Sequence, residues 1–208
     1  MLDDFELLEA WRAGDMLAGE ELFARHFDQV FGFFRTKLED AAEDLTQQTF
    51  MRCVESRDAF RNEASFRTYL FVVARSVLFG HLRKRMRAPA TVDFETTSLA
   101  DLGVLISRRL VVREDLKILV HALRRLPVEL QLAVELYYVQ GLRGQELVTA
   151  LGLPAGTVRS RIRRALEQLR DNMSELSASP QRIQTTLTDL ARWAAELREQ
   201  AVNDMSRR

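Results

Sequence analysis

Arginines near the C-terminal end of the chain have the type and spacing expected of nucleic-acid contacts. Residues 154–170 contain five basic residues and one acidic residue, and apolar residues recur between Val158 and Leu169 at helical spacing. The basic residues therefore occupy the outer faces of a predicted helix, where guanidinium groups can bind phosphates and base edges. The candidate contacts with duplex DNA are Thr157, Arg159, Ser160, Arg161, Arg163 and Arg164.

The elements before this helix predict a helix-turn-helix. Pro127 can begin a helix without losing a needed N–H, and Gly141 ends it. A short helix is predicted from about Gln145 to Leu151, and the following Gly152 can adopt the left-handed conformation of a tight turn. A short helix, a glycine turn and a basic amphipathic helix are typical of this DNA-binding motif. Because the turn is in register, DNA binding is favoured over a surface helix whose arginines are only solvated.

The sequence offers no arrangement for catalysis. His26, His81 and His121 are scattered, without the spacing of a metal site. Glu43 and Asp44 are adjacent, so they project from different faces of a helix and do not form a carboxylate pair. The sequence also lacks a glycine-rich phosphate loop. We therefore predict a protein that is not an enzyme, with no catalytic residue, no metal and no cofactor.

Composition predicts an all-α protein of the cytoplasm. The chain has 208 residues, 47% of them hydrophobic, with only 9 glycines and 4 prolines. No stretch reaches the ~20 apolar residues of a membrane span, and the acidic N-terminus is unlike a signal peptide, so we expect no membrane insertion. The single cysteine, Cys53, excludes an internal disulfide and suits a reducing compartment.

Charge is balanced over the whole chain but unevenly distributed along it. Residues 1–60 hold 6 basic and 14 acidic side chains, whereas residues 61–90 hold 7 basic side chains and one acidic, Glu63. The helix at 154–170 is the second basic segment. Two separate basic segments indicate two contacts with a polyanion, which leaves the acidic portion to face another partner.

Four helices are predicted in the N-terminal half, at about 3–13, 18–38, 41–56 and 65–87. On the third, the residues expected to point inward are Leu45, Thr49, Phe50, Cys53 and Val54. Those expected to face solvent or a partner are Asp44, Gln47, Gln48 and Met51. The fourth helix ends in His81, Arg83, Lys84, Arg85 and Arg87, more cations than a helix C-terminus needs. With the aromatic loop at Phe60 before it, this helix suits single-stranded DNA, where bases stack on rings and phosphates pair with cations.

Two further segments connect and extend these elements. Residues 88–106 have the composition of a linker. Another helix is predicted to begin somewhere between residues 107 and 115 and to lead into the helix-turn-helix. After a polar break at 173–179, apolar residues from Ile183 to Ala201 step by four and three, as in a helix with one apolar seam. So short a helix needs tertiary contacts. We predict that it either braces the helix-turn-helix domain or acts as a regulatory arm. Such an arm would cover part of the surface that binds DNA or the partner of the acidic portion, or would be held by a regulator.

In order and spacing, a set of short segments resembles the extracytoplasmic-function sigma factors of bacterial RNA polymerase over about residues 5–172. The segments are Ala42-Glu43-Asp44-Leu45 with Gln47 and Phe50, Phe60-Arg61, Ser65-Phe66-Arg67 with Leu70, Ala74-Arg75, His81-Leu82-Arg83, Leu126-Pro127, Gly152, Gly156-Thr157-Val158 and Ser160-Arg161. The resemblance implies two small helical domains joined by a flexible linker, the second a helix-turn-helix, with a C-terminal extra helix. The implied boundaries are 1–88, 89–110 for the linker, 111–172, and 173–208 for the extension.

The resemblance also implies a function, which is to direct core polymerase to promoter DNA and initiate transcription. The N-terminal domain would bind polymerase through Asp44, Gln47, Gln48, Phe50 and Met51. It would hold and open the proximal promoter element through Phe60, Arg61, Arg75, Ser76, His81, Arg83, Lys84, Arg85 and Arg87. The C-terminal domain would bind the distal element as duplex through the residues named above on the last helix of the motif. An anti-sigma factor or another regulator is a candidate partner.

Several positions depart from the residues usual in that family. Ser76 stands where asparagine is common, at a position associated with the pocket for a flipped promoter base, and Tyr69 stands where tryptophan is usual. In the helix-turn-helix, Val148 replaces a small residue and Arg143 replaces a serine or threonine cap. These departures bear on base preference and on the docking of the third helix.

The alternative function is a stand-alone helix-turn-helix transcriptional regulator. It accounts equally well for residues 126–170, but it leaves the segments at 41–56 and 65–87 unexplained. Tight and specific operator binding without polymerase would favour it.

Overall fold

The computed structural model describes residues 2–60, 64–85, 93–103 and 114–176, and the described residues are predominantly helical. Helices α1 (Asp4–Arg12), α2 (Met16–Arg35), α3 (Ala42–Glu55) and α4 (Phe66–Arg85) form the N-terminal part. Helices α5 (Glu114–Arg124), α6 (Val128–Val134), α7 (Gly144–Leu151) and α8 (Ala155–Leu176) form the C-terminal part. Short 3-10 helices, η1 (Glu39–Ala41) and η2 (Arg57–Ala59), flank α3, and a π-helical turn, η3 (Glu135–Val139), continues α6. The predicted all-α fold is confirmed, and no described helix is both long and apolar enough to cross a bilayer.

The first two helices begin at side-chain caps. Asp3 and Glu6 form a reciprocal capping box, with both N–H to carboxylate distances at 2.8 Å. Asp15 accepts from the amides of Leu17 and Ala18, and α2 therefore begins two residues before the predicted start at residue 18.

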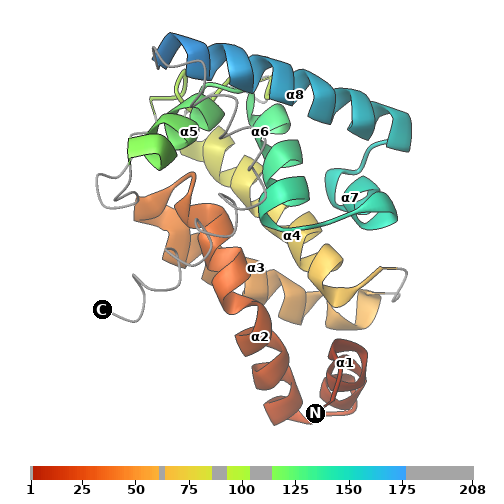
Figure 1. Cartoon of the computed structure of the whole chain (residues 1–208). Helices are drawn as coiled ribbons and strands as arrows, with labels where there is room; N and C mark the ends of the chain where they lie inside the picture. The colour runs from red at the N-terminus through yellow and green to blue at the C-terminus, as the bar shows by residue number, and fades with distance from the viewer. Residues whose placement is uncertain (1, 61–63, 86–92, 104–113, 177–208) are drawn as a thin grey trace.

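Helix α4 runs through the middle of the molecule, with α2 and α3 on one side and the C-terminal part on the other (Figure 1). It is buried on both sides, since Leu70 and Leu78 pack into the N-terminal core while Phe71 and Thr68 are buried as well. One continuous hydrophobic core joins the N-terminal part to Leu132, Leu136, Leu147 and other residues of the C-terminal part. A second core lies within the C-terminal part, between α5, α6 and α8.

The linker carries apolar residues that anchor it to both parts. Phe94 is buried and stacks on Phe79 of α4, with ring centroids 4.8 Å apart, and Leu99 is fully buried. The carbonyls of Thr97 and Phe94 accept from the first amides of α6, which Pro127 leaves without a side-chain cap. The linker-like composition of 88–106 did not indicate this docking. Residues 93–103 therefore hold α6 at a fixed place beside α4.

The helix-turn-helix forms as predicted. Gly152 ends α7 in the left-handed conformation, with φ at +65°, and α8 begins three residues later. Arg143 stands at the N-cap of α7 without capping it, and its guanidinium lies 3.7 Å from the centre of the Tyr137 ring.

One expected core position is on the surface instead. Val54 is 49% exposed. On α3 the other predicted inward residues, Leu45, Thr49, Phe50 and Cys53, are buried. Val54 is displaced because α3 packs between α2 and α4, and the helix turns this position away from both. The predicted C-terminal extra helix lies outside the described residues.

Candidate nucleic-acid interface

The outer face of α8 carries most of the predicted duplex contacts. Its buried residues follow a single stripe that includes Val158, Ala165 and Leu169. The predicted contact residues exposed opposite this stripe are Thr157, Arg159, Ser160, Arg163 and Arg164. Arg163 pairs with Glu167 on the same helix, at 3.9 Å, with both side chains largely exposed. These residues therefore form one solvent-facing basic surface behind the glycine turn.

Arg161 does not belong to that surface, so the prediction that it lies with the exposed contacts is wrong for this conformation. Its side chain is 8% exposed, and it donates to Glu129 at 2.9 Å and to Glu95 at 2.7 Å. Residues 158, 161 and 165 share one face of α8. The helical pattern alone could not reveal that carboxylates from the linker and α6 stand opposite that face.

Arg75, a predicted proximal contact, reaches the same carboxylate. It donates to the second oxygen of Glu129 at 2.8 Å, and its guanidinium lies 4.8 Å from the centre of the Phe79 ring. Glu129 is only 12% exposed in its side chain. This one residue thus bridges α4 to α8, and no sequence signal singled it out. We call Glu95, Glu129, Arg75 and Arg161 the inter-part ion network.

A different side of α4 faces solvent and carries Ser76. Ser76 accepts a 3.5 Å hydrogen bond from Arg52 of α3, and both side chains are exposed. Tyr69 lies two turns earlier on α4, with its ring 4.6 Å from that of Phe60. Arg52 was not among the predicted contacts, because it lies in an acidic segment of the sequence. The structure brings it together with Ser76.

The basic end of α4 is also exposed. Lys84 and Arg85 face solvent, and Arg85 lies 3.8 Å from Asp40. The guanidinium of Arg83 lies 5.5 Å from the centre of the Phe94 ring. His81 is half-buried, and this burial, followed by the charges of Arg85 and Lys84, lowers its pKa. Two other predicted contacts, Arg61 and Arg87, fall outside the described residues.

The outer face of α3 presents the residues predicted to meet another protein. Asp44, Gln47, Gln48 and Met51 are all exposed, Met51 by 55%. Phe50 is 9% exposed, with its ring 4.8 Å from that of Phe23, so it supports this face from beneath. Its predicted inward orientation is confirmed, and its predicted contact with another protein stays a prediction. Cys53 is a core residue, and burial raises the pKa of its thiol to about 12.

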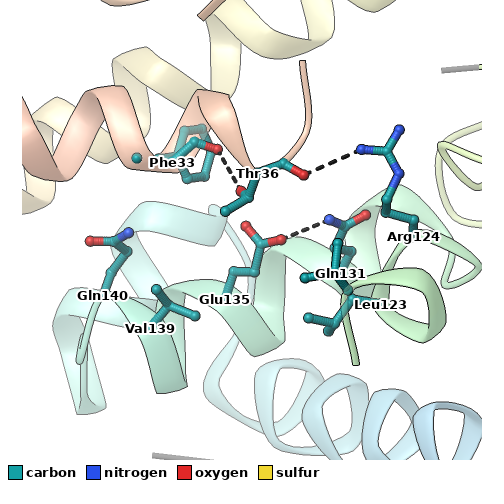
Figure 2. A pocket seen from close by; sticks show the side chains of 10 residues that line it. Phe33, Thr36, Leu123, Arg124, Gln131, Glu135, Val139 and Gln140 are labelled. Carbon is teal, nitrogen blue, oxygen red and sulfur yellow. Dashed lines mark hydrogen bonds between the residues drawn. The ribbon is translucent and has the colours of Figure 1, made fainter. Parts of the chain in front are cut away.

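Polar side chains are buried where α2 meets α5, α6 and η3, around a small cavity (Figure 2). Lys37 is 1% exposed and donates to Glu135 and to the carbonyl of Phe33. Burial lowers the pKa of Lys37, and the charge of Glu135 opposes that shift. Gln131 donates to Glu135 at 2.7 Å, and Arg124 donates to the carbonyls of Thr36 and Lys37. The contact between the two parts is therefore polar as well as apolar.

Comparisons with known proteins agree with this arrangement. The model of Sigma-70 region 2 matches residues 22–88, and that of Sigma-70, region 4 matches residues 116–169. Together these two models cover more than half of the chain.

Curated relatives match over most of their length. The RNA polymerase sigma-H factor of Pseudomonas aeruginosa is 29% identical over 176 residues, which is 80% of this chain and 91% of that protein. The ECF RNA polymerase sigma-E factor of Escherichia coli K12 is 29% identical over 184 residues, 84% of this chain and 96% of that protein.

A solved structure shares the fold. The sigma factor RpoE of Bartonella quintana, crystallised with the anti-sigma factor NepR, gives a TM-score of 0.59 at 23% identity, over 74% of this chain and 96% of that one. With both sigma-70 regions matched in order, and with α3, α4 and the Gly152 turn inside the matched residues, the chain belongs to the extracytoplasmic-function family of RNA polymerase sigma factors, which are not enzymes and act by binding core polymerase and promoter DNA.

Proposed function

We propose that the two parts of this sigma factor divide the promoter between them. Residues 1–88 bind core polymerase and hold the proximal element open, residues 111–172 bind the distal element as duplex, and residues 89–110 join them. The observation that carries this proposal is the exposed basic face of α8 directly after the Gly152 turn, since a helix so placed fits the major groove. The extension, 173–208, serves as a brace or a regulatory arm.

The distal element is contacted by Thr157, Arg159, Ser160, Arg163 and Arg164, and by Arg161 once its pairing with Glu129 opens. In the proximal element, Phe60 and Tyr69 offer stacking surfaces, while Ser76 and Arg52 offer hydrogen bonds to a displaced base. The basic end of α4, His81 to Arg85, binds the phosphates that follow, together with Arg87 beyond it in the sequence. Arg61, which follows Phe60 in the sequence, joins the contacts with the proximal element.

Core polymerase is contacted by the outer face of α3. Asp44, Gln47, Gln48 and Met51 form an exposed strip, and Phe50 packs beneath it. Asp44→Arg is expected to weaken the complex with core polymerase by on the order of tenfold, because a reversed charge meets the same partner. Glu20→Arg is the matched control, since it makes the same change from a carboxylate to a guanidinium at an exposed site on α2. Equal affinities of the two variants, measured by titration with labelled protein, would remove Asp44 from this interface.

The same assignments require the inter-part ion network to open when DNA binds. Arg75 and Arg161 are proposed promoter contacts, yet both are paired with Glu129 here. A phosphate would then replace the Glu129 carboxylate as the partner of Arg161. Lys37 and Arg124 make buried polar contacts between the two parts, and these suit a reversible interface. When the two parts separate, the polar groups can be hydrated by water.

A regulator that stabilises the arrangement in which the inter-part ion network is formed would keep the chain from binding its promoter. The Bartonella relative is bound by an anti-sigma factor, and we propose the same kind of partner for this chain. Since core polymerase and promoters are in the cytoplasm, the protein acts there.

Run-off transcription tests the function directly. Bacterial core polymerase is incubated with a pool of promoter fragments, with and without this protein. We expect new transcripts from a specific subset only when the protein is added. Specific DNA binding in the absence of polymerase, with no transcript in its presence, would instead support the stand-alone regulator.

A further inference from the structure

Two arginines cross-link the end of α1 to η2, the 3-10 helix that leads into the Phe60 loop. Arg12 of α1 donates to the carbonyl of Arg57 from Nη2 at 3.0 Å and from Nε at 3.3 Å, and Nη2 also donates to the carbonyl of Phe60. In return, Arg57 donates to the carbonyl of Trp11 at 3.3 Å, and its guanidinium lies 5.2 Å from the centre of the Trp11 ring. We call this pair of exchanges the arginine clasp.

The clasp fixes the Phe60 ring as well as its backbone. The Arg12 guanidinium lies 5.9 Å from the centre of that ring, and Tyr69 covers it from α4, with ring centroids 4.6 Å apart. Tyr69 is itself held by a hydrogen bond with Ser56, at the start of η2. Phe60 is therefore held in one orientation from both α1 and α4.

Helix α1 is a firm support for the clasp. Trp11 is 2% exposed and packs on Gly19 of α2, where an added Cβ would lie 2.7 Å from the indole, so the two helices meet as closely as glycine allows. Asp4 at the other end of α1 pairs with His26 and Arg25. Glu9 pairs with Arg12 at 2.6 Å and orients its guanidinium.

Only a guanidinium can make these contacts together. Arginine carries a planar fork of five donors, enough to reach both carbonyls and Glu9, while the ammonium of lysine is a compact point charge. Arg57 begins η2 and Phe60 follows it, so losing the fork removes a hydrogen bond from each carbonyl and frees Phe60.

We propose that Arg12 is a positioning residue for promoter opening, which holds Phe60 in the orientation that receives the non-template strand. This inference rests on the proposed role of Phe60 at the proximal element. It gives α1, which lies before the matched sigma-70 region 2, a part in that step.

Holoenzymes carrying Arg12→Lys and Arg12→Ala test the proposal. Promoter opening is followed by the fluorescence of 2-aminopurine placed in the proximal element, on a duplex promoter and on one whose proximal element is already mismatched. In both variants the 2-aminopurine signal of duplex opening should be about tenfold smaller than in wild type. This is the effect expected from losing a charge-assisted hydrogen bond. They should keep wild-type affinity for core polymerase and match wild type on the mismatched promoter.

Arg25→Lys is the matched control, because Arg25 also links α1 to α2 but does not touch the loop. It should leave opening unchanged. A loss of opening in the Arg12 variants that follows a lower unfolding temperature and weaker core binding would overturn the proposal in favour of a purely structural role. Normal opening by Arg12→Lys beside defective opening by Phe60→Ala would overturn it while leaving the role of Phe60 intact. Failure of the wild-type holoenzyme to open any promoter would instead refute the proposed function itself.

Discussion

Helices α8 and α4 both carry proposed promoter contacts, but they are buried in different ways. The buried residues of α8 form one stripe, and five of the six predicted contacts lie on the open faces. Helix α4 is packed against α2 and α3 on one side and against α7 and the linker on the other. Its contacts are confined to its exposed strip near Ser76 and to its basic end. A contact set can therefore be read from the periodicity of α8, whereas on α4 the neighbours decide which side chains are available.

The largest expected difference between the two helices is in stability. Phe71→Ala should lower the free energy of unfolding by about 3–5 kcal/mol, because Phe71 is 1% exposed within the core that joins both parts. Val72→Ala, at the next position but 37% exposed, should cost less than ~1 kcal/mol. Urea unfolding measures both. Similar costs would mean that α4 is not the central element described here.

The next largest effect concerns base reading by α8. Arg159→Ala should cost roughly 1–3 kcal/mol at one position of the distal element and relax specificity there. Arg164→Ala, on the same exposed surface, should weaken binding to all sequences and reduce the salt slope by about one, as expected of a phosphate contact. Competition binding with variant promoters at several salt concentrations separates the two. An equal loss of affinity for all promoter variants in Arg159→Ala would show that Arg159 contacts only the DNA backbone.

A smaller effect is expected where the two helices meet. Glu129→Gln removes the charge that holds Arg75 and Arg161, so the free protein should bind distal duplex about tenfold more tightly, a gain of ~1.4 kcal/mol. Glu20→Gln makes the same charge change at an exposed site on α2 and serves as the control. Fluorescence anisotropy with a labelled duplex measures both. Equal affinities would mean that the network does not compete with DNA.

The smallest effect is expected on the exposed strip of α4. Ser76→Asn should shift the preferred base of the proximal element by about a few-fold, since asparagine offers a different donor and acceptor set to a flipped base. The contact from Arg52 is long and solvent-exposed, so stability should not change. Transcription from a promoter library reads the preference, and an identical profile for both proteins would exclude Ser76 from base selection.

Much of this fold is readable in the chain because its signals are local. Helix caps, the glycine turn and the apolar stripe of α8 act within a few residues, and they predicted the helix-turn-helix and the exposed face of α3. Val54 was assigned inward from the same kind of periodicity and proved exposed. A helical pattern shows which residues share a face, but it does not show how much of that face the neighbouring helices cover.

By itself the sequence determined the all-α class, the order of the two regions and the identity of most exposed basic residues, because these follow from local propensity and short-range spacing. The tertiary structure alone decided the partners of single charges. Arg161 lies opposite Glu129 and Glu95, Lys37 opposite Glu135, and Arg12 opposite the η2 carbonyls. A charged side chain looks the same in a sequence whether it meets water or a buried carboxylate. Its role depends on Coulomb attraction and hydrogen bonds over a few ångströms, and only the folded chain sets those distances.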